Sequence, residues 1–192
     1  MVNKDAFIGK EINQVYLKED TRQKVRKSFL HGEFPAVILK DFFSTEFYSQ
    51  LTKKVSALDF KKEQVVVHHS YAVSKSQLSS KELTDFISFV TKKKIDELHF
   101  TAYLLTWKDY QILNDRYLEK PGIDIVIDLT DGWNPECGGV VTFTDGRGTV
   151  YPLAPAGNSL AMVERKKGLQ KYVQYLNHHA KDKKRLFLIA SI

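Results

Sequence analysis

The sequence predicts an α+β fold in which a two-sheet β-sandwich or jelly roll is backed by helices from the first half of the chain. Three segments with helical periodicity come early, whereas short stretches rich in β-branched and aromatic residues dominate the second half. One of these stretches, residues 122–130, alternates strictly between apolar and mostly polar side chains. With 192 residues, 43% of them hydrophobic, the chain suffices for one substantial core but not for two ordinary domains.

Helices are expected at three places. The first covers about residues 17–30 and is strongly charged. The second begins after Ser44, whose side chain suits the N-cap position. The third shows a capping-box pattern at Ser79 and Glu82 and ends in the lysine triplet 92–94, whose positive charge suits a helix C-terminus.

Strands are expected where short apolar stretches are bounded by Gly, Asp, Asn or Pro. These stretches are "PAVIL", "QVVVHHSYAV", "FTAYLLTW", "GIDIVIDLT", "GVVTFTD", "GTVYPL", "NSLAMVE", "QKYVQYL" and "RLFLIASI". In residues 122–130 one face carries Ile123, Ile125, Ile127 and Leu129, and the other carries Asp124, Val126, Asp128 and Thr130. We expect residues 1–33 to form a helical extension and residues 34–192 to form the β-rich domain.

Composition limits the classes of function. A single cysteine, Cys137, excludes an intramolecular disulfide and a structural zinc site of several thiolates, which favours a reducing, cytoplasmic environment. No apolar run approaches the roughly 20 residues of a membrane span. The net charge of +6 is concentrated in residues 92–94, 165–167 and 181–185, and such runs can neutralise phosphates or simply solvate helix ends and loops.

An ordered series of motifs carries a more specific signal. It runs "FPAVILKDFFSTEF", "AYLLTWKDYQILND", "IDLTDGWNPECGGVVTF", "PLAPAGNSLAMVE", "KYVQYL" and "RLFLIAS". This series resembles the prolyl-hydroxylase-like iron(II)/2-oxoglutarate dioxygenases over roughly residues 34–192. The resemblance implies a double-stranded β-helix, an iron site made of a His-x-Asp motif and a distal histidine, and 2-oxoglutarate as a cofactor.

The resemblance also assigns roles to individual residues. Arg185, at the start of the last strand, takes the place of the residue that binds the distal carboxylate of 2-oxoglutarate. A guanidinium suits this role because its planar fork makes two charge-assisted hydrogen bonds. Tyr103 takes the place of an assisting tyrosine, and Lys171 stands where the distal histidine belongs, within the same binding region.

The metal ligands are where the sequence departs from the family. "KDYQILNDRYL" occupies the place of the His-x-Asp motif and contains no histidine. One register puts Asn114 and Arg116 at the ligand positions, and the other leaves Asp115 as the only carboxylate. A protonated Lys171 repels a cation. Iron binding is therefore doubtful, and Asp115 is the one candidate metal ligand in this stretch.

Other histidines offer few substitutes. His99 opens the strand leading to the site and is the best placed, while a lone strand histidine is more often a packing residue. His31 has the His-x-acid spacing with Glu33 but precedes the first core strand. The pairs 68–69 and 178–179 would point their two rings to opposite faces if extended, so at most one of each pair can reach a common metal.

Three hypotheses follow. The first is a dioxygenase-fold protein with impaired or lost iron binding that serves as a binding module for a small anion or a peptide. The second is an active 2-oxoglutarate-dependent protein hydroxylase whose unusual ligands are built on Asp115. The third is a nucleic-acid- or ribosome-associated adaptor, which is favoured if the three basic runs share one face. The sequence does not decide whether the protein is an enzyme.

Overall fold

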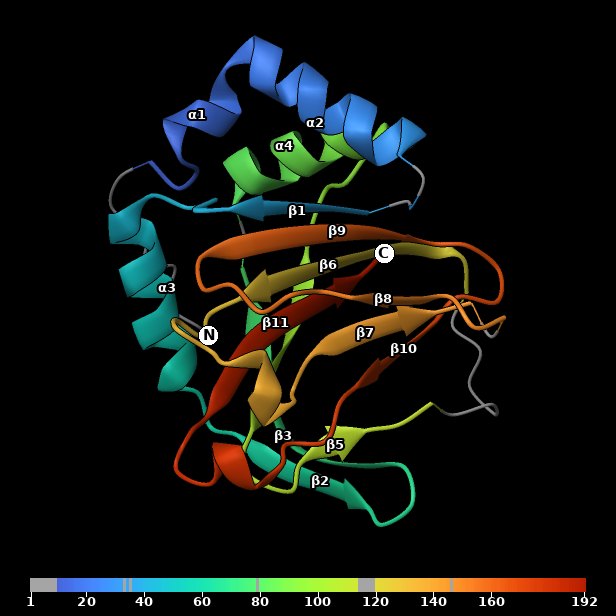
Figure 1. Cartoon of the computed structure of the whole chain (residues 1–192). Helices are drawn as coiled ribbons and strands as arrows, with labels where there is room; N and C mark the ends of the chain where they lie inside the picture. Colours follow the sequence, from blue (N-terminus) through green and yellow to red (C-terminus); the bar gives the residue numbers. More distant parts are fainter. Residues whose placement is uncertain (1–9, 33, 35, 79, 114–119, 146) are drawn as a thin grey trace.

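The chain folds into one curled antiparallel sheet with helices on its outer face (Figure 1). The structure is a computed structural model and describes residues 10–192 except 33, 35, 79, 114–119 and 146. Eleven strands in this part form the sheet, which curls into a half-barrel. This arrangement confirms the predicted α+β fold with a jelly-roll core.

The sheet has two walls that face each other across the barrel interior. In sheet order, the major wall consists of β1 (Ala36–Lys40), β9 (Ser159–Arg165), β6 (Gly122–Asp128), β11 (Arg185–Ser191), β4 (His99–Leu105) and β3 (His69–Gln77). The order continues through the minor wall, which consists of β5 (Tyr110–Gln111), β10 (Gln170–Val173), β7 (Val141–Thr144) and β8 (Val150–Pro152). Outside this order, β2 (Lys61–Val65) pairs with β3.

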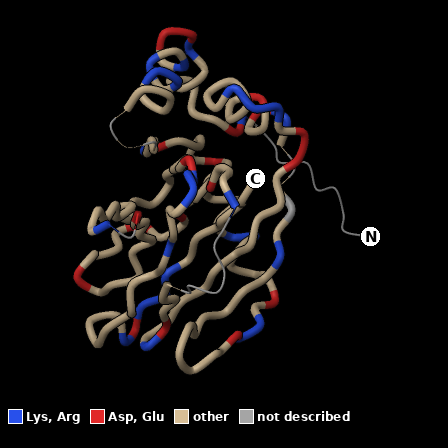
Figure 2. The backbone as a smooth tube through the Cα atoms, turned by 90° about the vertical axis from the view of Figure 1, so that its right-hand side faces the viewer, with Lys and Arg blue, Asp and Glu red and all other residues tan. Residues whose placement is uncertain are grey.

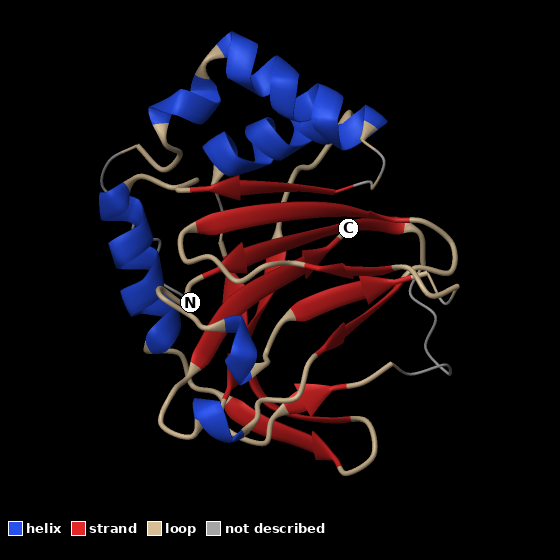
Figure 3. Cartoon of the chain, viewed as in Figure 1, coloured by secondary structure: helices blue, strands red, loops and turns tan. Residues whose placement is uncertain are grey.

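The α-helices pack against the outside of the major wall. They are α1 (Gln14–Leu17), α2 (Glu19–His31), α3 (Thr45–Ser56) and α4 (Lys81–Thr91). Figure 3 shows α1, α2 and α4 beyond β1 and α3 along the side of the sheet. Two short 3-10 helices, η1 (Pro135–Cys137) and η2 (His178–Ala180), lie in loops. No helix in the described ranges is long and apolar enough to cross a bilayer.

The alternation in β6 sorts its side chains between two hydrophobic cores. Ile123, Ile125 and Ile127 join the cluster that the major wall shares with the helices. Val126 joins the cluster inside the barrel. Because successive strand residues face opposite ways, Asp124 and Asp128 share the inward face with Val126. The predicted polarity of this strand is thereby confirmed, and its two carboxylates lie in the barrel interior.

The helix boundaries follow the predicted capping residues in part. The Ser44 hydroxyl accepts a hydrogen bond from the Phe47 N–H at 3.2 Å, so α3 begins where expected. For α4 the N-cap is Ser80, one residue later than the predicted Ser79, which lies outside the described residues. The helix ends before the lysine triplet because Lys92 adopts a left-handed backbone with φ 58°.

The N-terminal helices are built into the main core. Val25 and Phe29 of α2 are buried in the same cluster as the outward side chains of β6. Glu82 of α4 accepts hydrogen bonds from the backbone N–H groups of Glu11 and Ile12, at 3.0 and 3.1 Å, and so fastens the segment before α1. The division into residues 1–33 and 34–192 stays a prediction.

One expected strand is in fact a hairpin. The stretch "QVVVHHSYAV" divides into β2 and β3, and the His68 N–H closes the turn between them by donating to the Val65 carbonyl at 2.8 Å. The prediction of one continuous strand was wrong because no Gly, Pro, Asn or Asp marks this turn, while valine favours extended backbone on both sides of it.

Candidate functional site

The barrel interior holds a set of charged side chains that are almost fully buried. They come from four strands and comprise Asp124 and Asp128 of β6, Arg165 of β9, Lys171 of β10 and Arg185 of β11. Burying an isolated charge is costly, so each such group needs a partner of opposite sign. The pairings within this set therefore decide which charges are left to bind a ligand.

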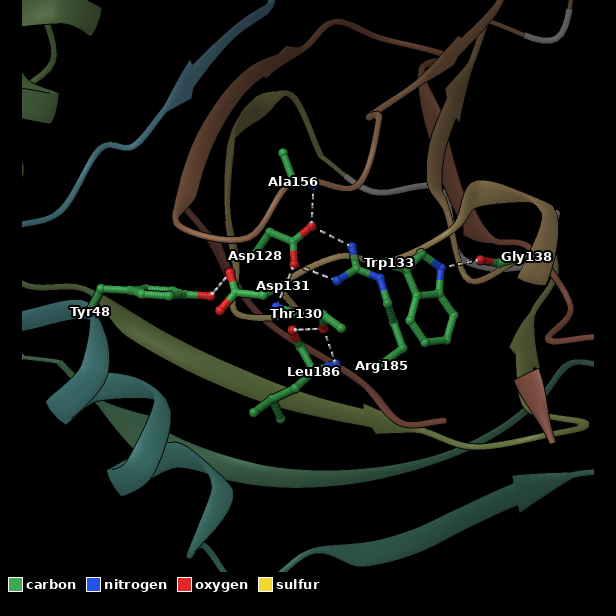
Figure 4. A network of polar contacts seen from close by, with 9 residues as sticks. All are labelled: Tyr48, Asp128, Thr130, Asp131, Trp133, Gly138, Ala156, Arg185 and Leu186. Atoms are coloured by element: carbon green, nitrogen blue, oxygen red, sulfur yellow. Dashed lines mark hydrogen bonds and ion pairs between the residues drawn. The ribbon is translucent and has the colours of Figure 1, made fainter. Parts of the chain in front are cut away.

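Arg185 and Asp128 form a bidentate ion pair (Figure 4). Nη2 of Arg185 donates to Oδ2 of Asp128 at 2.7 Å, and Nη1 donates to Oδ1. The carboxylate also accepts the backbone N–H of Thr130 at 2.9 Å and that of Ala156 at 2.8 Å. Two backbone groups and one guanidinium thus surround it, and both terminal nitrogens of Arg185 are engaged.

Aromatic rings enclose the guanidinium of Arg185. Its Cζ lies 5.5 Å from the ring centroid of Phe187 and 5.7 Å from that of Trp133. The indole Nε1 of Trp133 donates to the Gly138 carbonyl at 2.8 Å, which holds the ring in place. Gly138 has φ +80°, and a Cβ there would lie 2.0 Å from the Tyr175 carbonyl oxygen. The glycine therefore permits the close approach that positions Trp133.

Asp124 is the centre of a second buried cluster. Its Oδ1 lies 3.1 Å from Nη1 of Arg165 and accepts the Ser191 hydroxyl at 2.5 Å. Its Oδ2 accepts Nζ of Lys171 at 3.1 Å. Lys171 projects from β10 of the minor wall, so this ion pair joins the two walls across the interior. One carboxylate thereby faces two cations.

A row of rings lines the inner face of the major wall. His69 stacks on Tyr71 with centroids 4.8 Å apart, Tyr71 meets Tyr103 at 5.3 Å, and Tyr103 stacks on Phe187 at 5.2 Å. Burial raises the pKa of Tyr71, and the nearby Glu63 carboxylate raises it further. These rings form an apolar wall whose polar atoms are at the ring edges.

Outside this interior, Asp109 forms a third buried polar centre at the turn before β5. It accepts hydrogen bonds from the Ser70 hydroxyl at 2.9 Å and from the Thr106 N–H at 2.8 Å, and it pairs with Lys62 of β2. The turn is therefore tied to the β2–β3 hairpin. These bonds stabilise local structure and engage both carboxylate oxygens of Asp109.

The sequence-predicted site residues are only partly brought together. Arg185, Tyr103 and Lys171 all lie on the strands that enclose the interior, and their roles toward a cofactor stay predictions. Asn114, Asp115 and Arg116 lie outside the described residues.

The histidines considered as substitutes are dispersed. His99 is exposed and lies 3.4 Å from Glu97, and His31 ends α2. His178 and His179 belong to η2, with ring centroids 4.0 Å apart, so they do not alternate as strand residues would. Among the residues that the structure describes, no three His, Cys, Asp or Glu side chains are grouped to hold a metal.

The three basic runs do not form one surface. Residues 92–94 follow α4 on one side of the sheet, and residues 181–184 follow η2 at the opposite end (Figure 1). Arg165 and Arg185 are buried against Asp124 and Asp128. Figure 2 shows lysine and arginine spread over the fold and interleaved with acidic residues. This scatter counts against the nucleic-acid hypothesis, which a shared basic face would have favoured.

Reasoning from the sequence missed the partners of these cations. Asp124, Asp128 and Arg165 were not proposed as site residues. The signal that points to the two aspartates is their place on the inward face of a strand buried along its whole length, where a carboxylate must find a cation. For Arg165 no comparable signal is present in the sequence.

Comparison with known proteins places the fold. No family model matches the chain. A prolyl-4-hydroxylase from Pseudomonas putida superimposes with a TM-score of 0.66 at 10% identity, covering 88% of this chain and 97% of that one. A 2OG-Fe(II) oxygenase-family oxidoreductase from Burkholderia pseudomallei gives a TM-score of 0.68 at 10% identity and 91% coverage of both chains.

A third similar structure is a prolyl hydroxylase from Trichoplax adhaerens in complex with a peptide fragment of the hypoxia inducible factor oxygen degradation domain. It has a TM-score of 0.66 at 12% identity and covers 93% of this chain and 91% of that one. The chain therefore has the fold of the prolyl hydroxylases and related 2OG-Fe(II) oxygenases. At these identities the likeness concerns the fold, and function depends on the residues within it.

Proposed function

We propose that the protein is a peptide-binding module on a dioxygenase fold, in which the chain's own ion pairs take the place of iron and 2-oxoglutarate. The observation that carries this proposal is the pairing of Arg185 with Asp128. An internal carboxylate occupies the fork that a ketoacid carboxylate would need, and covalent attachment gives it a high effective concentration.

The described residues do not fit the two cofactors. The ammonium of Lys171, which the family resemblance puts at the place of the distal histidine, is bound to Asp124, so it offers a positive charge instead of a lone pair. Displacing Asp128 from Arg185 would leave a buried carboxylate without its cation, at a cost of about 3–5 kcal/mol. Both features argue against iron and 2-oxoglutarate in this interior.

Peptide binding is supported by the fold and by the inner wall. One protein of the same fold has a solved structure in complex with a peptide fragment. In this chain Tyr71 is buried, while the adjoining rings of His69 and Tyr103 are partly exposed and offer apolar surface to such a ligand. Aromatic faces bind extended and proline-containing segments well because those segments lose little conformational entropy on binding.

The test combines metal analysis with ligand titration. The purified protein is incubated anaerobically with iron(II), desalted and assayed for bound metal, then titrated with 2-oxoglutarate by calorimetry. We expect no stoichiometric iron, no saturable heat and no succinate release in the presence of ascorbate and proline-containing peptides. Turnover that disappears in Asp115→Ala would overturn the proposal and establish the protein hydroxylase instead.

A further inference from the structure

The exposed aromatic side chains of the protein come from two adjoining segments. Within the described ranges, the Phe, Tyr and Trp side chains that are exposed are Trp107, at 37%, and Tyr175, at 50%. Trp107 lies in the turn between β4 and β5, and Tyr175 follows β10. The Lys108 N–H donates to the Leu176 carbonyl at 3.0 Å, and the Leu176 N–H donates to the Asp109 carbonyl at 2.8 Å. The two exposed rings therefore belong to backbone segments that lie side by side.

Lysine side chains surround the ring of Trp107. The ammonium of Lys108 lies 4.3 Å from the ring centroid, and that of Lys181 lies 6.0 Å from it. Lys183 and Lys184 are exposed in the same loop after η2. We name this surface the Trp107 platform, and its members are Trp107, Lys108, Tyr175, His178, His179, Lys181, Lys183 and Lys184. All of them are exposed, and the rings of the two histidines lie 4.0 Å apart.

The lysines of the platform are not neutralised by the rest of the described chain. No carboxylate among the residues that the structure describes lies within ion-pair distance of them. Lys183 instead lies 3.8 Å from the Sγ of Cys137. The acidic residues nearest in the chain and in the adjoining η1 helix are Asp182 and Glu136. Four lysines against two carboxylates leave the platform positive.

Exposed rings beside free ammonium groups match one class of ligand. Each nucleotide of a single strand carries a flat base that can stack on an aromatic ring and a phosphate that can pair with a lysine. Duplex bases already stack on each other and offer only phosphates. An acidic peptide supplies charge without requiring ring faces, and a bilayer calls for aliphatic side chains, which the platform does not contain.

From these observations we infer that the Trp107 platform binds single-stranded nucleic acid. Bases stack on Trp107 and Tyr175, and the ammonium groups of Lys108, Lys181 and Lys184 hold the flanking phosphates. Such a site uses one basic run, so it does not need the face shared by three runs that a larger interface would have. The inference goes beyond the proposed function, because the platform consists of exposed loop residues outside the barrel interior.

The main experiment measures binding of a fluorescein-labelled oligouridylate of roughly twelve nucleotides to the full chain by anisotropy. We expect saturable binding at low salt, weakened by roughly ten-fold or more in Trp107→Ala. Trp107→Phe should keep most of the affinity, because a phenyl ring still stacks on a base. Thermal denaturation of both variants checks that the fold is retained.

The phosphate contacts are tested by the dependence of binding on salt. Lys181→Ala should bind more weakly, and its plot of log K against log salt concentration should be flatter by about 0.7, the value for one phosphate contact on a single strand. The matched control is Lys24→Ala, because Lys24 is an exposed lysine on α2 at the opposite end of the molecule (Figure 1). This control should match the wild type in affinity and slope.

Tryptophan fluorescence tests the stacking itself. The chain has two tryptophans, and Trp133 is buried, so a base that stacks on Trp107 should quench the emission of the exposed indole. Unlabelled oligouridylate should therefore quench the wild type and leave the emission of Trp107→Phe unchanged, although that variant still binds. Equal quenching in the two proteins would place the bases elsewhere and overturn the inference.

Other outcomes would overturn it as well. They are absent binding of both oligouridylate and oligothymidylate, or binding that Trp107→Ala leaves unchanged. Equally tight binding of a duplex or of polyphosphate would show that charge alone acts. Binding to phosphatidylserine vesicles alone, lost in Trp107→Ala, would assign the platform to a membrane. Binding of either oligonucleotide supports the inference, and the tighter one identifies RNA or DNA. Iron-dependent succinate release would overturn the proposed function and leave this inference standing.

Discussion

Arg185 and Asp128 stand 57 residues apart in the chain and meet as a bidentate pair in the barrel interior. The strand register creates this meeting, because β11 pairs with β6 so that Phe187 lies opposite Asp128. The guanidinium then reaches the carboxylate beside the Trp133 ring. A cation that would otherwise attract a ligand is neutralised by the next strand of the same sheet.

Removing one partner of this pair should destabilise the protein nearly as much as removing both. Asp128→Ala or Arg185→Ala leaves one buried charge unpaired, and each should lower the free energy of unfolding by about 3–5 kcal/mol. The double variant should lose less than the sum, which urea denaturation of the four proteins measures. The exposed pair Lys81–Asp85 is the control, with an expected coupling of less than about 1 kcal/mol. Additive losses at Arg185 and Asp128 would contradict their direct coupling.

A small carboxylate should rescue Asp128→Ala. The substitution removes the carboxylate but leaves the Arg185 fork and the N–H groups of Thr130 and Ala156 around the vacated space. Formate matches the lost group, so it should raise the Tm of Asp128→Ala with a saturable dependence on concentration. Chloride at equal ionic strength should not do so. The Asp128→Ala, Arg185→Ala double variant should respond to neither ion, and an equal response to formate there would exclude Arg185 as the anchor.

The alternation of side chains in β6 could be predicted from the sequence, but the ion pairs that these side chains make could not. Strict alternation in residues 122–130 predicted which side chains of β6 share a face, because strand geometry has a period of two. The approach of Arg185 to Asp128 depends on the register between β11 and β6, which a single sequence does not specify. The same limit applies to Lys171 and Asp124, which lie on opposite walls.

The hairpin of β2 and β3 shows a different limit. Val65, Val66 and Val67 were expected inside a continuous strand because valine favours extended backbone. The turn after Val65 is closed by backbone hydrogen bonding and by the Tyr110 hydroxyl, which comes from a segment 44 residues away. A turn held by tertiary contacts leaves no local signal, and the exposure of the valines follows from that turn.

Two glycines that both have a positive φ should respond differently to alanine. Gly132 has φ +60°, and no atom lies within 4 Å of the place that a Cβ would take, so Gly132→Ala should cost only the left-handed strain of about 1–2 kcal/mol. At Gly138 the added methyl would meet the Tyr175 carbonyl oxygen at 2.0 Å, so Gly138→Ala should cost more than about 4 kcal/mol. Thermal and urea denaturation compare the two variants. Similar losses would show that the loop after Trp133 can shift.

Glu11 should make stability depend on pH near neutrality. Burial raises the pKa of Glu11 from 4.5 to about 7, and the neighbouring Glu82 carboxylate adds to the rise. The folded state then binds more protons than the unfolded state between these two pH values, so the free energy of unfolding falls as pH rises through that window and levels off above it. The Glu82 carboxylate accepts hydrogen bonds from the backbone N–H groups of Glu11 and Ile12, so it does not donate a hydrogen bond to the Glu11 carboxylate.

The substitution Glu11→Gln isolates this effect. The amide carries no charge at any pH, so the variant should match the wild type in urea midpoint near pH 5 and exceed it near pH 8. Other titrating groups, including the histidines, cancel in the difference between the two proteins. Asp59→Asn serves as the matched control, because Asp59 is an exposed carboxylate beyond the end of α3. A Glu11→Gln curve parallel to the wild-type curve from pH 5 to 8 would mean that neither burial nor the Glu82 carboxylate raises the pKa of Glu11 in the folded protein.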